Sequence, residues 1–313
     1  MRNAFAEQIT MLAKQDDRIV LLSGDIGNRL FDEFKTLFPE RFLNCGVAEA
    51  NMMSVAAGLA SDGFRPVVYT IAPFVTTRCL EQIRDDICYP ALPVTIVAVG
   101  AGLSYAALGA THQSLEDIAF LRALPDMSVV CPADALEAKA ALPLCIDHNA
   151  PVYLRMGKKG EPVVHSTEPQ ITLGESAMLQ DGNHACILTT GTMATVALQA
   201  AEQLEQEDLS IRVENFHTVK PLDKSALEKC FRRFDLIATI EEHSRIGGFG
   251  SAVSEWLADT PFTGKTLLRF GTQDKFIHEA TNQESAREYH GLTTDCVAAE
   301  LRQRLDLRPA RFG

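Results

Sequence analysis

The chain has 313 residues, 46% hydrophobic and 22% charged, a composition that is typical of a globular protein and excludes wholesale disorder. Its 41 Asp and Glu outnumber its 29 Lys and Arg, and the net charge of −12 makes nucleic acid and anionic membranes poor partners. The 8 cysteines include no C-x-x-C pair and no apolar leader follows Met1, so we expect reduced thiols, no metal site and a cytoplasmic protein.

Predicted helices and strands alternate through the first half of the chain. The opening helix over 5–12 and the helices over 48–60, 80–87 and 116–123 alternate with strands over 19–23, 64–69, 94–99, 127–131 and 152–155. Asp134 is placed to cap a helix that follows the fourth of these strands. The uncharged run 87–115 contains prolines and glycines, which favours a strand and a loop and excludes a membrane-spanning helix.

A polar stretch from Gly157 to Gln170 predicts a linker, after which the alternation restarts. Strands are expected over 186–189, 211–215, 236–240 and 266–270, and helices over 191–204, 248–257 and 294–305. Nearly continuous apolar strands between helices indicate parallel sheets covered by helices on both faces. The fold prediction is therefore α/β, with one domain over 1–160 and a smaller one over 161–313.

Familiar catalytic motifs are absent from the sequence. It has no G-x-G-x-x-G, no G-x-x-x-x-G-K-[ST] and no G-x-S-x-G, so simple dinucleotide, P-loop and hydrolase sites are not predicted. Three local features remain, namely Glu49 among small residues at a helix start, His112 in a glycine-bearing loop, and Phe74 just past a strand end. Taken singly, each has an ordinary explanation as a helix-dipole partner, a capping residue or a core aromatic.

Taken in order, these segments resemble the transketolase family over nearly the whole chain. Gly46-Val-Ala-Glu49, Gly63-Phe-Arg-Pro66, Phe74, Gly109-Ala-Thr-His112-Gln113 and Leu124-Pro-Asp-Met-Ser-Val-Val-Cys-Pro-Ala-Asp134 are similar to its pyrimidine-binding domain. His217-Thr-Val-Lys-Pro-Leu-Asp223 and Gly247-Gly-Phe-Gly-Ser-Ala-Val253 are similar to its carboxy-terminal domain. The resemblance implies two doubly wound domains and ketol transfer between sugar phosphates with thiamine diphosphate.

The resemblance also implies a partner. A long transketolase begins with a domain whose G-D-G motif and downstream Asn hold the divalent metal and the diphosphate, and no G-D-G occurs here. Since the similarity to the second domain begins at Arg2, we expect a split enzyme. This chain would pair with a separate amino-terminal subunit that holds Mg²⁺ or another divalent metal, two copies of each forming a heterotetramer.

By resemblance, four residues serve the cofactor. Glu49 is the carboxylate that hydrogen-bonds the aminopyrimidine nitrogen and assists the proton transfer that activates the thiazolium carbon. Phe74 stacks on the aminopyrimidine, Ile71 falls where a second aromatic is common, and Asp25 falls on an aspartate near the cofactor.

By the same resemblance, four residues serve the substrate. His112 hydrogen-bonds sugar hydroxyls, and Arg2 and Arg155 hold the substrate phosphate, for which a guanidinium is well suited. Arg29 stands where the family often has a serine near that phosphate. The ordinary alternative for each arginine is a loose surface ion pair.

Two positions depart from the family pattern. Leu108 replaces an Asp that contacts a hydroxyl beside the reacting carbon, and Gly100 replaces a phosphate-binding His. Both changes remove polar contacts from the substrate side and leave the cofactor side intact. We therefore expect an unusual substrate, such as the branched ketose phosphate apulose 4-phosphate.

Three alternatives remain open at this point. The chain could be the β subunit of a 2-oxo acid dehydrogenase, although its Gly-Ala-Thr-His-Gln loop favours transketolase. The deoxyxylulose phosphate synthases share the His-Gln loop but carry all their domains in one long chain. A non-catalytic partner subunit is disfavoured by Glu49, since a buried carboxylate is costly without a ligand.

Overall fold

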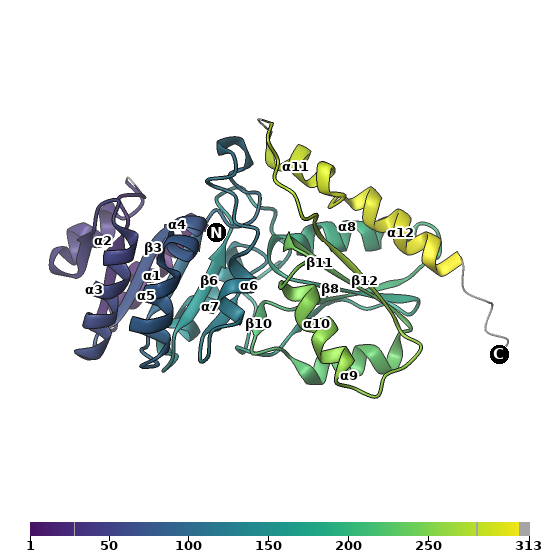
Figure 1. Cartoon of the computed structure of the whole chain (residues 1–313), viewed down its shortest axis with the longest axis horizontal. Helices are drawn as coiled ribbons and strands as arrows, with labels where there is room; N and C mark the ends of the chain where they lie inside the picture. The colour runs from purple at the N-terminus through teal and green to yellow at the C-terminus, as the bar shows by residue number, and fades with distance from the viewer. Residues whose placement is uncertain (28, 280, 307–313) are drawn as a thin grey trace.

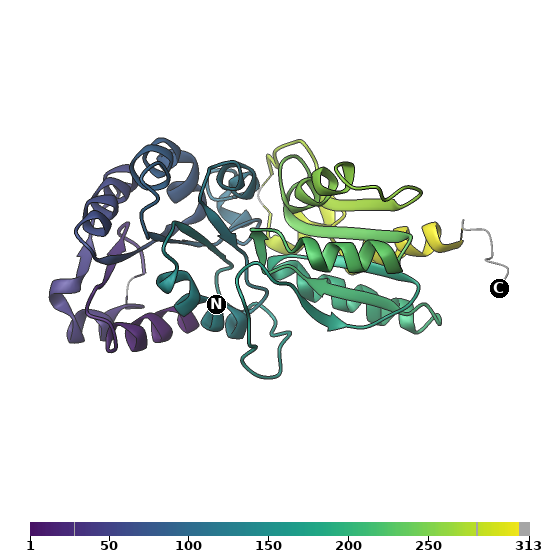
Figure 2. The same ribbon diagram turned by 90° about the horizontal axis from the view of Figure 1, so that it is seen from below.

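The computed structural model describes residues 1–27, 29–279 and 281–306, and it contains two β-sheets, each covered by helices (Figure 1). The helices and strands divide between two lobes that lie side by side along the long axis of the molecule (Figure 2). No helix in these described ranges is long and apolar enough to cross a membrane.

The first sheet has seven strands in the order β10-β5-β6-β4-β3-β1-β2. All neighbours are parallel except β10, which pairs antiparallel with β5. The register aligns Ser23, Tyr69 and Val97, so the carboxyl ends of β1, β3 and β4 lie at one edge. The strands are β1 (Ile19–Ser23), β2 (Phe42–Asn44), β3 (Arg65–Ile71), β4 (Thr95–Val99), β5 (Ser128–Val130), β6 (Val152–Met156) and β10 (Thr218–Lys220).

Helices cover both faces of this sheet. One buried apolar cluster joins it to α1 and α7, and another joins it to α3, η3 and α6. The predicted cap is confirmed, because the Asp134 side chain accepts a hydrogen bond from the Glu137 N–H of α7. The helices are α1 (Arg2–Ala13), α2 (Asp32–Leu37), α3 (Glu49–Ser61), α4 (Ala72–Thr76), α5 (Leu80–Gln82), α6 (Asp117–Arg122) and α7 (Ala135–Asp147), with the short turns η1 (Pro39–Arg41), η2 (Thr77–Cys79), η3 (Ile83–Cys88) and η4 (Ala106–Leu108).

The second sheet has five strands in the order β12-β11-β8-β9-β7, parallel except for the edge strand β7. One face carries α8 and α12, and the other carries α9 and α10. The strands are β7 (Ala177–Gln180), β8 (Ala185–Thr189), β9 (Ile211–Asn215), β11 (Leu236–Ser244) and β12 (Thr266–Thr272); the helices are η5 (Gly191–Met193), α8 (Ala194–Glu205), α9 (Lys224–Arg233), α10 (Phe249–Ala258), α11 (Gln283–His290) and α12 (Thr294–Asp306).

The predicted fold class, two doubly wound α/β units, is confirmed. The segment 157–176 contains no helix or strand, as the predicted linker requires. One strand crosses the predicted division, because β10 belongs by sequence to the second half and by pairing to the first sheet. An apolar cluster continues from Val129 and Cys131 to Phe216 and Phe249, so the two halves share a core.

Candidate active site

Side chains predicted to act on cofactor and substrate gather at the carboxyl edge of the first sheet. Asp25 follows β1, Glu49 opens the helix after β2, Phe74 lies in α4 after β3, and His112 lies in the long loop after β4. The carboxyl ends of parallel strands meet at one edge, and the loops there are where α/β sheets bind ligands. Four segments far apart in the sequence therefore contribute to one region.

Glu49 is a buried carboxylate, with its side chain 4% exposed, at the first turn of α3. Its Oε2 lies 3.2 Å from the Arg78 Nη1. Gly24 leaves room beside it, because a Cβ there would lie 3.5 Å from Glu49 Cγ and 2.9 Å from Thr70 Oγ1. The helix N-terminus stabilises the negative charge, and the paired Arg78 offsets part of the cost of burying it.

Arg78 is a residue that the sequence analysis missed. Its guanidinium carbon lies 4.0 Å from the centre of the Phe74 ring while its Nη1 pairs with Glu49. The spacing of four residues between Phe74 and Arg78 places both on one side of a helical turn, and that spacing is the signal that could have identified the pair. Arg78 thus ties together two of the predicted cofactor residues.

Phe74 also contacts His112. The two rings meet edge to face with their centres 5.0 Å apart, and the His112 Nδ1 lies 2.9 Å from the Thr111 Oγ1. Partial burial, together with the positive charge of Arg78, lowers the pKa of His112 below its usual value. At neutral pH the imidazole is therefore neutral, with one nitrogen able to donate a hydrogen bond and the other able to accept one.

Asp25 and Arg29 lie on the exposed turn after β1. Both have positive φ angles, of 55° and 64°, and Asp25 accepts a hydrogen bond of 3.0 Å from the Asn44 side-chain amide. Because Asn44 ends β2, this bond joins the turn to the segment that leads into Glu49. Ile71 ends β3 and packs, half-buried, against the apolar cluster under α1.

Arg2 begins α1 and is half-buried. Its Nε and the Tyr69 hydroxyl are both buried without a hydrogen-bond partner among the described residues. Buried donors of this kind cost free energy unless something satisfies them. Arg2 therefore has the free capacity that a predicted anion-binding residue needs.

Arg155 is held differently from Arg2. It is buried, and its Nε and Nη2 bond the two oxygens of Asp117 at 2.7 and 3.2 Å. Nη2 also donates to the backbone carbonyls of Ser114 and Glu242. The arginine predicted to hold a substrate phosphate thus forms a buried ion pair that fixes the end of the loop after β4.

That loop also explains the two departures from the family pattern. Gly100 has φ +75°, and a Cβ there would lie 1.9 Å from the Tyr105 ring, so the tyrosine occupies the space that a larger residue at 100 would need. Leu108 ends the short helix η4 and is 56% exposed. A leucine side chain can offer no hydrogen bond to a hydroxyl beside it.

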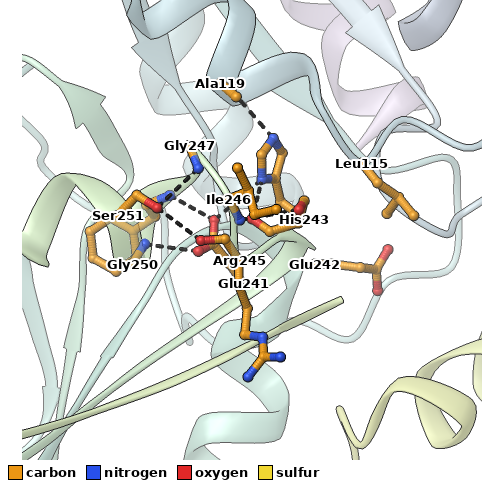
Figure 3. A network of polar contacts seen from close by, with 12 residues as sticks. Leu115, Ala119, Glu241, Glu242, His243, Arg245, Ile246, Gly247, Gly250 and Ser251 are labelled. Carbon is orange, nitrogen blue, oxygen red and sulfur yellow. Dashed lines mark hydrogen bonds and ion pairs between the residues drawn. The ribbon is translucent and has the colours of Figure 1, made fainter. Parts of the chain in front are cut away.

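The carboxyl end of β11 holds this loop from the second domain (Figure 3). The Glu242 side chain accepts the Leu103 N–H at 2.7 Å, accepts from Gln283 and pairs with Arg287. The Ser244 N–H donates to the Leu115 carbonyl at 2.8 Å. We call these contacts, together with the Asp117–Arg155 pair, the interdomain joint.

Two further buried groups complete the interdomain joint. Glu241 accepts the Phe249 and Gly250 N–H groups at the start of α10, and burial raises its pKa to about 7. His243 accepts the Ala119 N–H at Nε2 and donates from Nδ1 to the Ser244 carbonyl, and burial lowers its pKa to about 4. Since His243 is fully buried, it packs between the domains.

Family models and relatives agree on what this architecture is similar to. Residues 1–161 match the family described as "Transketolase, pyrimidine binding domain", and residues 174–297 match "Transketolase, C-terminal domain". No cluster of three or more His, Cys, Asp or Glu able to hold a metal ion occurs among the described residues.

Three curated relatives match along nearly their whole length. A putative transketolase C-terminal section from Methanocaldococcus jannaschii is 35% identical over 97% of this chain and 96% of its own. A subunit of apulose-4-phosphate transketolase from Phocaeicola vulgatus is 37% identical over 92% of both chains. The 6-deoxy-6-sulfo-D-fructose transketolase subunit SqwH from a Clostridium species is 34% identical over 98% of this chain and 96% of its own.

A solved structure described as a split gene transketolase, inactive beta4 tetramer, superposes with a TM-score of 0.89. It is 36% identical and is matched over 98% of this chain and 99% of its own. The fold and the order of the two domains are therefore the same in both proteins.

Proposed function

This chain belongs to the transketolase family, a family of thiamine-diphosphate-dependent ketol transferases, and we propose that it supplies the aminopyrimidine and sugar side of a two-chain transketolase. The observation that carries this proposal is the buried Glu49 carboxylate beside the Phe74 ring, at the carboxyl edge of the first sheet. An acid and an aromatic face at one edge fit a ring that offers both a basic nitrogen and a flat surface.

The cofactor residues of this chain fit that group. Glu49 Oε2 is held by Arg78, which leaves Oε1 available to share a proton with the aminopyrimidine nitrogen. Phe74 would fix the plane of the ring and Ile71 would close the aliphatic side of the same wall, with Asp25 on the turn above them. Thiamine diphosphate, when bound, supplies the nucleophilic carbon for ketol transfer.

The residues of this chain then perform the remaining tasks. Glu49 holds the proton at its carboxylate oxygen, and its burial keeps competing water away from that oxygen. The neutral His112, in edge contact with Phe74, is placed to hydrogen-bond a sugar hydroxyl. The interdomain joint, Arg155 included, keeps the His112 loop in position without touching the reacting atoms.

We assign the substrate phosphate to Arg2 and Arg29. Arg2 has a buried Nε without a partner among the described residues, and Arg29 is exposed on the turn that carries Asp25. Arg155, the third arginine predicted for this task, would have to leave Asp117 to reach a substrate, so we assign it a positioning role. Two guanidiniums at one edge suit a terminal dianion.

The substrate we propose is a ketose phosphate of non-standard geometry next to the reacting carbon. Leu108 cannot accept a bond from a hydroxyl there, and the Tyr105 ring covers Gly100. Two of the relatives are named for unusual sugars, apulose 4-phosphate and 6-deoxy-6-sulfo-D-fructose. A branched ketose phosphate is therefore our first candidate.

We further propose a heterotetramer of two copies of this chain and two of an amino-terminal subunit that holds the divalent metal and the diphosphate. The support comes from relatives whose names describe a C-terminal section and one subunit of a larger enzyme, and from a relative described as inactive when it forms a beta4 tetramer. These names favour a split transketolase over the β subunit of a 2-oxo acid dehydrogenase.

The experiment is reconstitution with an amino-terminal transketolase section and a panel of ketose donors. We expect ketol transfer by the mixture and none by either chain alone, with apulose 4-phosphate preferred over xylulose 5-phosphate. A Leu108→Asp variant should shift the preference toward xylulose 5-phosphate. A native preference for xylulose 5-phosphate with ribose 5-phosphate would overturn the substrate proposal, and ketol transfer by the isolated chain would overturn the split.

A further inference from the structure

Three arginines gather around one cavity of the second domain, although the whole chain carries a net charge of −12. The cavity has a volume of about 500 Å³ and lies between the edge strand β12 and the helix α12. Arg245 and Arg269 line it from the sheet, and Cys296, Glu300 and Arg304 line it from one face of α12, at successive intervals of four residues. Only Arg304 pairs with a carboxylate there, that of Glu300 at 2.9 Å.

The other two guanidiniums are uncompensated. Among the residues that the structure describes, neither Arg245 nor Arg269 forms an ion pair with a carboxylate. Arg269 donates to the Arg245 carbonyl at 3.1 Å and to the Ser251 hydroxyl at 3.3 Å. Figure 3 shows the Arg245 side chain pointing away from the network around Glu241, with its guanidinium free of the contacts drawn. The cavity wall therefore carries a local excess of two positive charges.

The backbone is shaped to let Arg245 lie there. A Cβ on Gly271 of β12 would meet Arg245 Cγ at 2.8 Å and the His243 carbonyl oxygen at 2.9 Å. Glycine at 271 allows the aliphatic part of Arg245 to lie directly on the edge strand. The position of this arginine is thus a consequence of packing and is not that of a freely moving surface side chain.

A neutral donor adds to the two cations. His290 lines the same cavity, is 5% exposed, and accepts the Gln273 N–H at its Nδ1. Its proton therefore sits on Nε2, a buried atom with no hydrogen-bond partner among the described residues. A buried donor without a partner is costly, and an anion in the cavity is a partner that would relieve that cost.

We propose that this cavity binds a small phosphorylated metabolite, with the phosphate held by Arg245 and Arg269. Two free guanidinium forks and a neutral N–H donor are the groups that recognise a phosphate dianion, and the volume leaves room for an organic group of a few carbons. The site lies in the second domain, while the cofactor and sugar residues lie at the edge of the first sheet. It would make the transketolase a protein with two separate phosphate sites.

Cys296 provides a direct test, because it lines the cavity and is exposed while every other cysteine is buried or partly buried. The 313-residue chain would be treated with iodoacetamide, a neutral reagent, and the alkylation of each cysteine followed by mass spectrometry. Glycerol 3-phosphate is the probe, since it is a phosphomonoester but no ketol donor. Glycerol, glycerate and KCl at equal ionic strength are the controls.

We expect glycerol 3-phosphate to slow Cys296 alkylation about tenfold at ten times its dissociation constant, because only the unliganded fraction reacts. Cys45, in the other domain, should react at an unchanged rate. Arg245→Gln with Arg269→Gln should abolish the protection, and either single change should weaken it. Arg232→Gln, which removes an exposed arginine paired with Glu228 on α9, should leave it intact.

Equal rates in glycerol 3-phosphate and in KCl would overturn the proposal. Full protection in a double variant with an unchanged circular dichroism spectrum would also overturn it. Stronger protection by glycerate than by glycerol 3-phosphate would overturn the choice of a phosphate ligand.

Discussion

The cofactor edge of the first sheet and the interdomain joint differ in how their polar groups are satisfied. At the edge, Glu49 has a single partner, the half-exposed Arg78, and Arg2 Nε has none among the described residues. In the joint, Asp117 is bonded by both Arg155 and Tyr153, and Glu242 by a backbone amide and two side chains. Groups that must accept a ligand are left with free capacity, whereas groups that hold the loop are saturated.

This difference predicts which property each region controls. A side chain with few partners in its own chain contributes little to folding and can be replaced without unfolding the domain. A buried charge with several partners leaves those partners unsatisfied when it is removed. Substitutions at the edge should therefore reduce activity, and substitutions in the joint should reduce stability.

The largest expected effect is that of Glu49→Gln. The amide cannot share the proton that the carboxylate holds, so we expect kcat to fall by about 10³ in the reconstituted enzyme, the scale of a lost general acid–base group. The melting temperature should stay within about 2 °C of wild type, because no core packing is lost. Steady-state kinetics at saturating thiamine diphosphate and thermal unfolding measure the two quantities, and near-native turnover would show that Glu49 has another role.

The next effect is that of Arg155→Met, at the centre of the joint. Burial alone would raise the pKa of Asp117, but the charge of Arg155 holds it below its usual value, so removing the arginine leaves a buried carboxylate without its cation. We expect the free energy of unfolding to fall by about 3–5 kcal/mol, as for other broken buried pairs. Urea unfolding measures this loss.

Two controls sharpen that experiment. Arg155→Met combined with Asp117→Leu should be more stable than Arg155→Met alone, since neither charge is then left unpaired. Arg302→Met, which breaks the exposed pair with Glu207, should cost less than about 1 kcal/mol. Equal losses for the exposed and buried pairs would remove the contrast between the joint and the surface.

Arg78→Met tests the cofactor edge at an intermediate scale. Without the guanidinium, Glu49 and Phe74 lose the side chain that spans them, and we expect kcat/KM to fall about tenfold, which corresponds to about 1.4 kcal/mol. Lysine at this position should restore part of the loss, because it retains the charge but not the planar fork. Arg84→Met, which removes an exposed arginine paired with Asp85, is the matched control and should change nothing. An unchanged kcat/KM in Arg78→Met would show that Arg78 does not position the acid.

How much of this could be read from the sequence depends on the range of the contacts. Strands such as β1 and β4 are continuous apolar runs, and they are where the pattern predicts them. The three-residue β10 has no pattern of its own, because it forms only by pairing with β5 of the other domain. The short β2 and β7 were missed for a similar reason, since few of their side chains are buried.

The same distinction applies to the candidate site. The order of Glu49, Phe74 and His112 along the chain was sufficient to predict their shared edge, since parallel strand ends must meet. The partner of Arg155 was not predictable, because Asp117 lies 38 residues away on a different element. Whether an arginine meets a substrate or a buried aspartate depends on the tertiary packing around it, and no local spacing reports that packing.

The smallest expected effect concerns the pH dependence of the joint. Burial lowers the pKa of His243 to about 4, while an unfolded chain would bind its proton near pH 6.5. The unfolded state therefore binds more protons between pH 6.5 and 4, and the contribution of His243 to stability falls as the pH falls through that window. Glu241, with its pKa raised to about 7, contributes in the opposite sense, because there the folded state binds the extra proton.

Comparing wild type with His243→Gln isolates the histidine, because Glu241 is present in both proteins. Glutamine keeps a donor for the Ser244 carbonyl and an acceptor for the Ala119 N–H, but it does not titrate. Between pH 7.5 and 5.5 we expect wild type to lose about 1 kcal/mol more of its free energy of unfolding than the variant does. Urea unfolding at the two pH values measures the difference. A variant with the same pH dependence as wild type would mean that His243 is not held neutral by its burial, and the saturation of the interdomain joint would then rest on the Asp117–Arg155 pair and Glu242 alone.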